Sequence, residues 1–134
     1  MAFDFGLKRI GVAVGETVTK TARPLQTLPA KKGVPDWALI QQLIKRFEPS
    51  ALIVGIPLKM NGATLSVTRA ARAFKAALMA HCAIPVYETD ERLTTKAARD
   101  RIFQAGGYRA LQEKTIDAYA AQLILEHWFA TILR

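Results

Sequence analysis

Short apolar segments at the start of the chain alternate with turn residues in the pattern of β-strands. Residues 3–5 and 10–14 are strand candidates, and Gly6 lies in the segment between them, where glycine permits a tight reversal. Residues 23–28 form a weaker candidate in which Pro24 is typical of an edge strand or of a strand start. We therefore predict three antiparallel strands at the start of the chain.

The rest of the chain alternates between helical and strand patterns. Asp36 is a typical N-cap for a helix whose apolar residues recur at helical spacing, and this helix is expected to end at Pro49. Residues 51–55 form a continuous apolar run, which is typical of a strand covered on both faces. The further expected elements are a loop over 31–35, a loop over 56–62, a helix over 64–81, a strand over 84–88, a helix from Thr94 or Thr95 to 104, and a final helix over 115–132.

This order of elements predicts an α/β fold. Three antiparallel strands followed by alternating helices and strands favour one mixed five-stranded sheet with helices on both faces. The chain has 134 residues without a repeat or a linker, so we expect residues 1–134 to form a single domain.

Composition adds a strong positive charge to this picture. The chain has 19 Lys and Arg against 11 Asp and Glu, a net charge of +8, and its 51% of hydrophobic residues suffice for a packed core rather than a disordered basic tail. A basic folded domain indicates an anionic partner, first nucleic acid and second a membrane surface. The single cysteine, Cys82, excludes an internal disulfide and argues against a cysteine zinc site.

Targeting signals are not evident in the sequence. No apolar run approaches the ~20 residues that span a bilayer, and the first residues lack the pattern of a signal peptide. We therefore expect a cytoplasmic protein without a membrane partner.

Acidic residues occupy unusual places in this pattern. Asp4 lies inside a strand candidate, where period two puts it on the face opposite Phe3 and Phe5, although it could also be an exposed strand-end carboxylate or a partner of Lys8. Asp90 and Glu91 are expected just past a strand end, where α/β sheets bind ligands. On a surface loop they would instead pair with nearby basic residues.

Asp117 is the acidic residue that departs most from its surroundings. It lies four residues before Ala121, so it is expected in the first turn of the last helix and on the inward face defined by Ala121, Ile124, Leu125, Trp128 and Ile132. The alternative is a negative charge favoured there by the helix dipole. If Asp4, Asp117 and a carboxylate of the Asp90–Glu91 segment converge, their mutual repulsion calls for a divalent cation, and oxygen ligands suit Mg²⁺ or Mn²⁺.

Basic residues near these acids could bind the phosphates of a nucleic acid. They are Lys8, Arg9, Lys59 and Arg92, each of which could also orient a carboxylate. A solvated helix face is the simpler interpretation of Arg69, Arg72 and Lys75, and the histidines and tryptophans are interpreted as structural or surface groups: His81, His127, Trp37 and Trp128.

Four segments resemble motifs of the YqgF/RuvX family of nucleases, which is related to the RuvC Holliday junction resolvase. They are residues 4–14 (DFGLKRIGVAV), 53–62 (IVGIPLKMNG), 90–95 (DERLTT) and 116–121 (IDAYAA), and their order and spacing match over nearly the whole chain. The resemblance implies an RNase H-like fold and a metal-dependent nuclease that uses Mg²⁺ or Mn²⁺. It also implies that Asp4, Glu91 and Asp117 are the catalytic and metal-binding residues, with Asp90 and Thr94 as candidate supporting residues.

The resemblance leaves three functions open. The first is maturation of the 5′ end of pre-16S rRNA, in association with the ribosome. The second is resolution of branched DNA, which needs two active sites and hence a homodimer rather than a monomer. The third is a non-catalytic nucleic-acid-binding module in ribosome assembly, which needs the basic surface but no metal.

Overall fold

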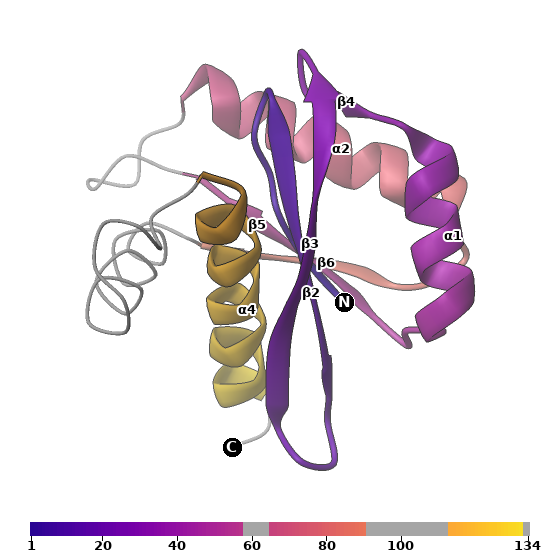
Figure 1. Ribbon diagram of the computed structural model, residues 1–134, viewed down its shortest axis with the longest axis vertical. Coiled ribbons are helices and arrows are strands. Elements are labelled where there is room, and N and C mark those ends of the chain that lie inside the picture. The colour runs from indigo at the N-terminus through magenta and orange to yellow at the C-terminus, as the bar shows by residue number, and fades with distance from the viewer. Residues whose placement is uncertain (58–64, 91–112, 133–134) are drawn as a thin grey trace.

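The computed structural model of the protein describes residues 1–57, 65–90 and 113–132. Its centre is a six-stranded sheet with the order β4-β3-β2-β1-β5-β6 (Figure 1). The strands are β1 (Ala2–Asp4), β2 (Arg9–Glu16), β3 (Thr21–Lys31), β4 (Val34–Pro35), β5 (Leu52–Ile56) and β6 (Val86–Asp90), and the described helices are α1 (Trp37–Phe47), α2 (Ser66–His81) and α4 (Glu113–Ile132).

The sheet is mixed, as the sequence predicts. β1, β2 and β3 form consecutive antiparallel pairs, whereas β1 pairs with β5, and β5 with β6, in parallel. Helices α1 and α2 lie on one side of the sheet and α4 lies on the other (Figure 1). The prediction of an α/β fold with helices on both faces is confirmed.

The strand count is the main difference from the prediction. Residues 31–35 were expected as a loop, but Val34 and Pro35 form β4 by pairing with Lys31 and Ala30 across a turn at Gly33, whose φ is +83°. Two residues are too few to produce a recognisable alternation, so this strand leaves no signal in the hydrophobic pattern. The five-stranded prediction is therefore wrong by one short edge strand.

Pro24 lies at an irregularity in the pairing of β2 with β3. Val12 pairs with Gln26 and Ala13 with Pro24, so β3 has one extra residue, Leu25, at this point. A bulge tolerates a proline because the regular hydrogen-bond ladder is interrupted there. The strand nevertheless continues through it and is longer at both ends than the predicted 23–28.

Two apolar cores cover the two faces of the sheet. The core under α1 and α2 includes Phe3, Val12 and Val54, and the core under α4 includes Ala2 and Ile53. Neighbouring residues of β1 and of β5 thus enter different cores, as the period of two requires. All five residues of β5 are buried, which confirms that this strand is covered on both faces.

The first helix has the boundaries that its sequence signals indicate. The Asp36 carboxylate accepts a hydrogen bond from the Ala38 N–H at 3.0 Å and caps α1. At the other end, Glu48 adopts the left-handed conformation and Pro49 follows. The predicted helix over 94–104 lies outside the described residues, as does most of the predicted 56–62 loop.

The last helix, α4, buries its apolar side chains against the sheet. Ala120, Ala121, Ile124 and Leu125 are buried, whereas Ile132, the last residue of the helix, was expected on the same face and is 48% exposed. Within the described residues, no helix has the length and apolar character required to traverse a lipid bilayer.

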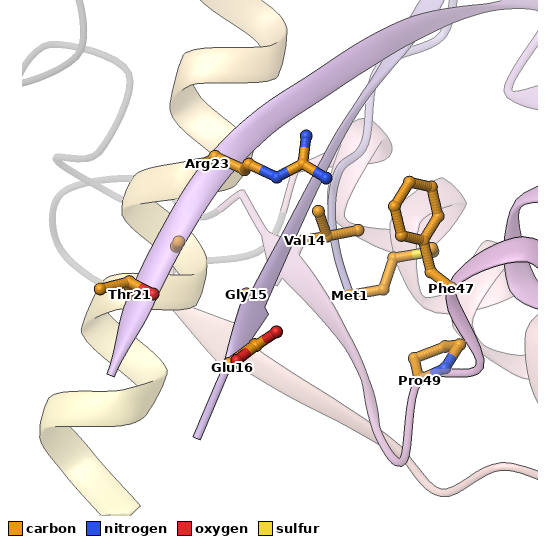
Figure 2. A pocket seen from close by; sticks show the side chains of 9 residues that line it. Met1, Val14, Gly15, Glu16, Thr21, Arg23, Phe47 and Pro49 are labelled. Atoms are coloured by element: carbon orange, nitrogen blue, oxygen red, sulfur yellow. The ribbon is translucent and has the colours of Figure 1, made fainter. Parts of the chain in front are cut away.

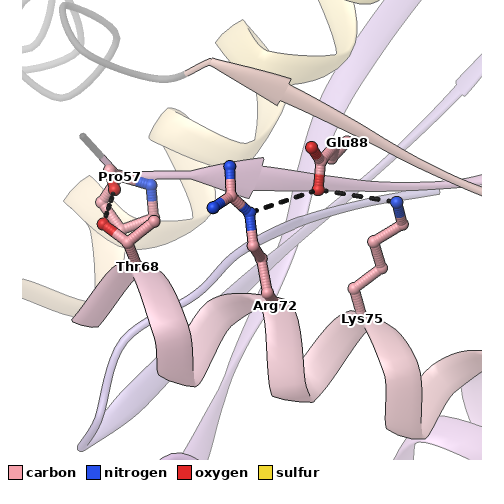
Figure 3. Close-up of polar contacts among 5 residues, drawn as sticks. All are labelled: Pro57, Thr68, Arg72, Lys75 and Glu88. Carbon is pink, nitrogen blue, oxygen red and sulfur yellow. Dashed lines mark hydrogen bonds and ion pairs between the residues drawn. The ribbon is translucent and has the colours of Figure 1, made fainter. Parts of the chain in front are cut away.

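A buried hydroxyl connects the end of β5 to the start of α2. Thr68 is fully buried, and its hydroxyl donates to the Pro57 carbonyl (Figure 3). The same hydroxyl accepts a hydrogen bond from the Leu65 N–H at 2.9 Å. Pro57 and Leu65 lie on either side of residues 58–64. One side chain therefore satisfies backbone groups at both ends of this connection.

We predict that Thr68→Val lowers the free energy of unfolding by about 1–3 kcal/mol, because it leaves the partly buried Pro57 carbonyl and Leu65 N–H without the hydroxyl that they bind. Urea denaturation measures the loss. Thr68→Ser, which keeps the hydroxyl and removes one methyl group, should cost less. A valine variant as stable as the wild type would show that the hydroxyl is not needed at this position.

Candidate active site at the carboxyl ends of the parallel strands

The topology places the carboxyl ends of three strands at one edge of the sheet. β1, β5 and β6 run parallel and end at Asp4, Ile56 and Asp90. This is the edge at which open α/β sheets generally bind their ligands. The chain segments 58–64 and 91–112, which follow β5 and β6, lie outside the described residues.

Asp4 is a buried carboxylate on the α4 face of the sheet. It is 8% exposed, and Ala2, two residues before it, packs against α4, while Phe3 packs in the opposite core. The predicted placement opposite the phenylalanines is confirmed. The alternative of an exposed strand-end carboxylate is wrong, since almost no solvent reaches the residue.

Gly11 allows α4 to lie directly against the sheet beside Asp4. Asp4 pairs with Gly11 on β2 and with Gly55 on β5, so both its neighbours in the sheet lack a side chain. A Cβ atom on Gly11 would lie 2.0 Å from the Asp117 carbonyl oxygen. The missing side chain thus brings the backbone of Asp117 to the strand position next to Asp4.

Asp117 lies in the second turn of its helix rather than in the first. α4 begins at Glu113, two residues before the predicted start near Thr115, so Asp117 is its fifth residue. The interpretation as a helix-dipole charge loses support, because that effect is confined to the first turn. The side chain is 25% exposed, which agrees with the predicted inward side.

Arg9 forms an ion pair with Asp117. Its Nε donates to Asp117 Oδ2 at 3.1 Å, and the two side chains are 32% and 25% exposed. Arg9 was expected to bind phosphate or to orient a carboxylate, and the structure places it against the carboxylate. Lys8, the neighbouring candidate, is exposed to solvent.

Asp90 lies on the other face of the sheet. It was expected just past a strand end, but it is the last residue of β6 and pairs with Ile56, which belongs to the core under α1 and α2. Two residues earlier, Glu88 forms ion pairs with Arg72 and Lys75 of α2, at 3.9 and 3.5 Å (Figure 3). Strand alternation therefore separates Asp90 from Asp4 and Asp117.

The remaining candidate residues belong to the segments that follow β5 and β6 in the sequence. Glu91, Arg92, Thr94 and Lys59 lie outside the described residues. The packing role predicted for Trp37 is confirmed, because its ring stacks on His81 at 4.1 Å between centroids and on Phe74 at 5.8 Å. Trp128 likewise packs beside Tyr87 and Phe129.

A pocket that the sequence analysis did not anticipate lies at the opposite edge of the sheet. It has a volume of about 340 Å³, and Val14, Glu16, Arg23 and Phe47 are among its lining residues (Figure 2). Glu16 and Arg23 come from β2 and β3, near the amino end of β1. Because neither Asp4 nor Asp117 lines it, this pocket is separate from the candidate active site.

Comparisons with known proteins agree with this fold. The chain is 48% identical over 129 residues to a Histophilus somni protein and 46% identical over 129 residues to one from Proteus mirabilis, both named "Putative pre-16S rRNA nuclease"; 96% of this chain is covered, with 92% and 93% of the relatives. A Thermus thermophilus RuvC structure in complex with a Holliday junction substrate covers 98% of this chain and 92% of its own, with a TM-score of 0.55 and 22% identity, which shows a shared fold.

A family model also matches nearly the whole chain. The model described as "RuvX: Holliday junction resolvase" matches residues 1–131, which include the strands, α1, α2, all but the last residue of α4, and both Asp4 and Asp117. The structural likeness to RuvC confirms the expected RNase H-like architecture. The chain therefore belongs to the RuvX family.

Proposed function

We propose that this protein is a metal-dependent nuclease that hydrolyses phosphodiester bonds of precursor 16S rRNA during maturation of its 5′ end, in the cytoplasm. Membership of the RuvX family and relatives named as pre-16S rRNA nucleases support this proposal. The observation that carries it is the close contact at Gly11, which puts the helix bearing Asp117 beside the buried carboxylate of Asp4.

The acidic residues suit a hard divalent cation. Asp4 and Asp117 present carboxylate oxygens, which Mg²⁺ and Mn²⁺ prefer over nitrogen or sulfur ligands. Among the described residues no group of three or more potential ligands is present, and we assign the third position to Glu91, which directly follows Asp90. When bound, the cation supplies an activated water and neutralises charge on the leaving oxygen.

The residues of the chain would bind and orient the substrate. The net charge of +8 attracts a polyanion, and Lys8, Lys59 and Arg92 are the proposed phosphate contacts around the acids. Arg9 holds Asp117, and Thr94 is the proposed supporting residue, whereas Asp90 faces the other side of the sheet and is given no role in the site. Hydrolysis adds water across one phosphorus–oxygen bond, and the leaving oxygen takes up the proton.

Branched DNA is the alternative substrate. The family description and the fold shared with RuvC favour it. A four-way junction has two strands to cut symmetrically, so this function requires a dimer with two sites. Processing of an RNA end requires one site, and a ribosome-associated monomer suffices for it. A module without catalysis would keep the basic surface and would not respond to Mn²⁺.

We predict that Asp4→Asn and Asp117→Asn each reduce cleavage by about 100-fold or more, because an amide binds a divalent cation far less tightly than a carboxylate does. Cleavage of a precursor 16S rRNA 5′ fragment and of a four-way DNA junction is measured in parallel with Mg²⁺ and with Mn²⁺. Cleavage of the junction in preference to the RNA, by a dimer, would select the alternative substrate.

Asp36→Asn is the matched control for this experiment. It makes the same chemical change at the N-cap of α1, where asparagine caps as well as aspartate does, so activity should stay at the wild-type level. Circular dichroism establishes that all three variants fold. Full activity in folded Asp4→Asn and Asp117→Asn proteins would rule out the proposed site.

Gly11→Ala tests the close contact itself. The new Cβ would overlap the Asp117 carbonyl, so α4 must move away from the sheet; we predict a loss of stability of about 1–3 kcal/mol and a loss of activity of about 100-fold. Gly33→Ala is the control. Its added Cβ would strain the backbone at φ +83° and would meet the Phe5 ring, and both effects lie away from α4. It should lose stability while keeping its activity when folded. Equal activity in both variants would contradict the role of Gly11.

A further inference from the structure

The contact between Arg9 and Asp117 is built into the geometry of β2. Arg9, Gly11 and Ala13 share one face of the strand by the period of two, and Gly11 is the point at which α4 touches that face. Arg9 is therefore the next residue on this face of β2 before Gly11, which contacts the Asp117 backbone. Its Nε is 3.1 Å from Asp117 Oδ2, although the two residues are 108 positions apart.

A comparison within the chain shows how close this pair is. Arg72 and Glu88 form an ion pair on the opposite face, with 3.9 Å between Nε and Oε2 and with side chains 48% and 39% exposed. The Arg9–Asp117 pair is shorter and less exposed, at 32% and 25%. Solvent and salt therefore screen it less, and its charge acts more strongly on anything bound beside Asp117.

We propose that Arg9 is a positioning residue that acts through Asp117 as the resident counter-charge of the cation site. In the metal-free protein its guanidinium balances the Asp117 carboxylate next to the buried Asp4. When a cation is present, the same positive charge limits how tightly the cation binds. This inference rests on the proposed function, because it concerns the cation that the function requires.

Two opposing effects of Arg9 on cation affinity can be ranked by size. The arginine fixes the orientation of a short carboxylate side chain, and this ordering is worth about a twofold to threefold gain in affinity. It also places a positive charge 3.1 Å from an Asp117 carboxylate oxygen, and repulsion of a divalent cation held by that carboxylate would cost about tenfold or more in affinity even with strong screening. The repulsion exceeds the benefit of ordering, so removal of the charge should tighten cation binding.

Catalysis should respond in the opposite direction. One carboxylate oxygen can accept from arginine while the other binds a cation, and the arginine then fixes the direction of the carboxylate. Without that hydrogen bond, the carboxylate gains rotational freedom, and the cation is held in a less defined position. A variant without the arginine should therefore bind the cation more tightly and turn over more slowly.

The experiment measures Mn²⁺ affinity by calorimetry and the turnover number at saturating Mn²⁺, on the full chain. Arg9→Met removes the charge and keeps most of the bulk, and Arg9→Gln is a second neutral variant in case the first does not fold. We expect both to bind Mn²⁺ about tenfold more tightly than the wild type and to turn over at least about tenfold more slowly. Arg9→Lys should keep the wild-type affinity, because it keeps the charge.

Arg72→Met is the matched control, since it removes an arginine from an ion pair on the other face of the sheet. It should leave Mn²⁺ affinity within about twofold of the wild type. The thermal shift on adding Mn²⁺ gives a second readout, which should be larger for Arg9→Met than for the wild type because tighter binding stabilises the folded state more.

The possible outcomes separate this inference from the proposed function. Unchanged or weaker Mn²⁺ binding by the neutral variants would overturn the counter-charge role while the nuclease proposal stands. A raised KM for RNA at unchanged Mn²⁺ affinity would make Arg9 a phosphate contact instead, and would overturn the role as well. No Mn²⁺ binding by the wild type would overturn the metal-dependent function and this inference with it.

Discussion

The absence of a side chain at Gly11 is the constraint on which the candidate site depends. With only hydrogen at that position, the backbone of α4 reaches the surface of β2, and the Asp117 carbonyl occupies the space in which a Cβ would lie. The buried small residues Ala118, Ala120 and Ala121 are consistent with a helix held close to the sheet. Packing of α4 on β2 therefore brings two carboxylates from distant parts of the sequence into one region.

The sheet separates this region from the larger of the two apolar cores. The face under α1 and α2 carries the aromatic core, in which Phe74 contacts Phe3, Phe5 and Trp37. The α4 face has a smaller core of residues such as Ala2 and Ile53, and it carries Asp4. On the α4 face, Gly11 lets the helix backbone reach the sheet beside Asp4.

The sequence predicted the elements whose signals are long and local. The apolar run over β5 predicted a buried strand, and Asp36 predicted the start of α1. The structure confirms both. β4 could not be predicted because two residues carry no period, and the start of α4 at Glu113 was missed by two residues because its first turn lacks the apolar pattern. Local patterns define interiors of elements better than their ends.

The same distinction applies to the site. Asp4 and Asp117 were identifiable because each is an acidic residue in an apolar period, and that anomaly is visible in a single sequence. The ion pair of Arg9 with Asp117 could not be identified from the sequence. It joins residues 108 positions apart, which the close approach of α4 to Gly11 brings together. The face of Asp90 depended on strand register: with β6 extended to residue 90, the alternation places it beside Ile56 on the far side.

Charge balance connects the site to the whole molecule. The net charge of +8 draws a polyanion toward the surface, yet Asp4 and Asp117 would repel a phosphate at the point where cleavage is proposed. Arg9 supplies a positive charge to Asp117, and in the proposed function a divalent cation would supply further positive charge beside the carboxylates. Long-range attraction by the basic surface and short-range neutralisation by a cation are therefore separate requirements. A protein that only bound nucleic acid would gain nothing from burying a carboxylate such as Asp4 at this edge, and this favours the catalytic interpretation.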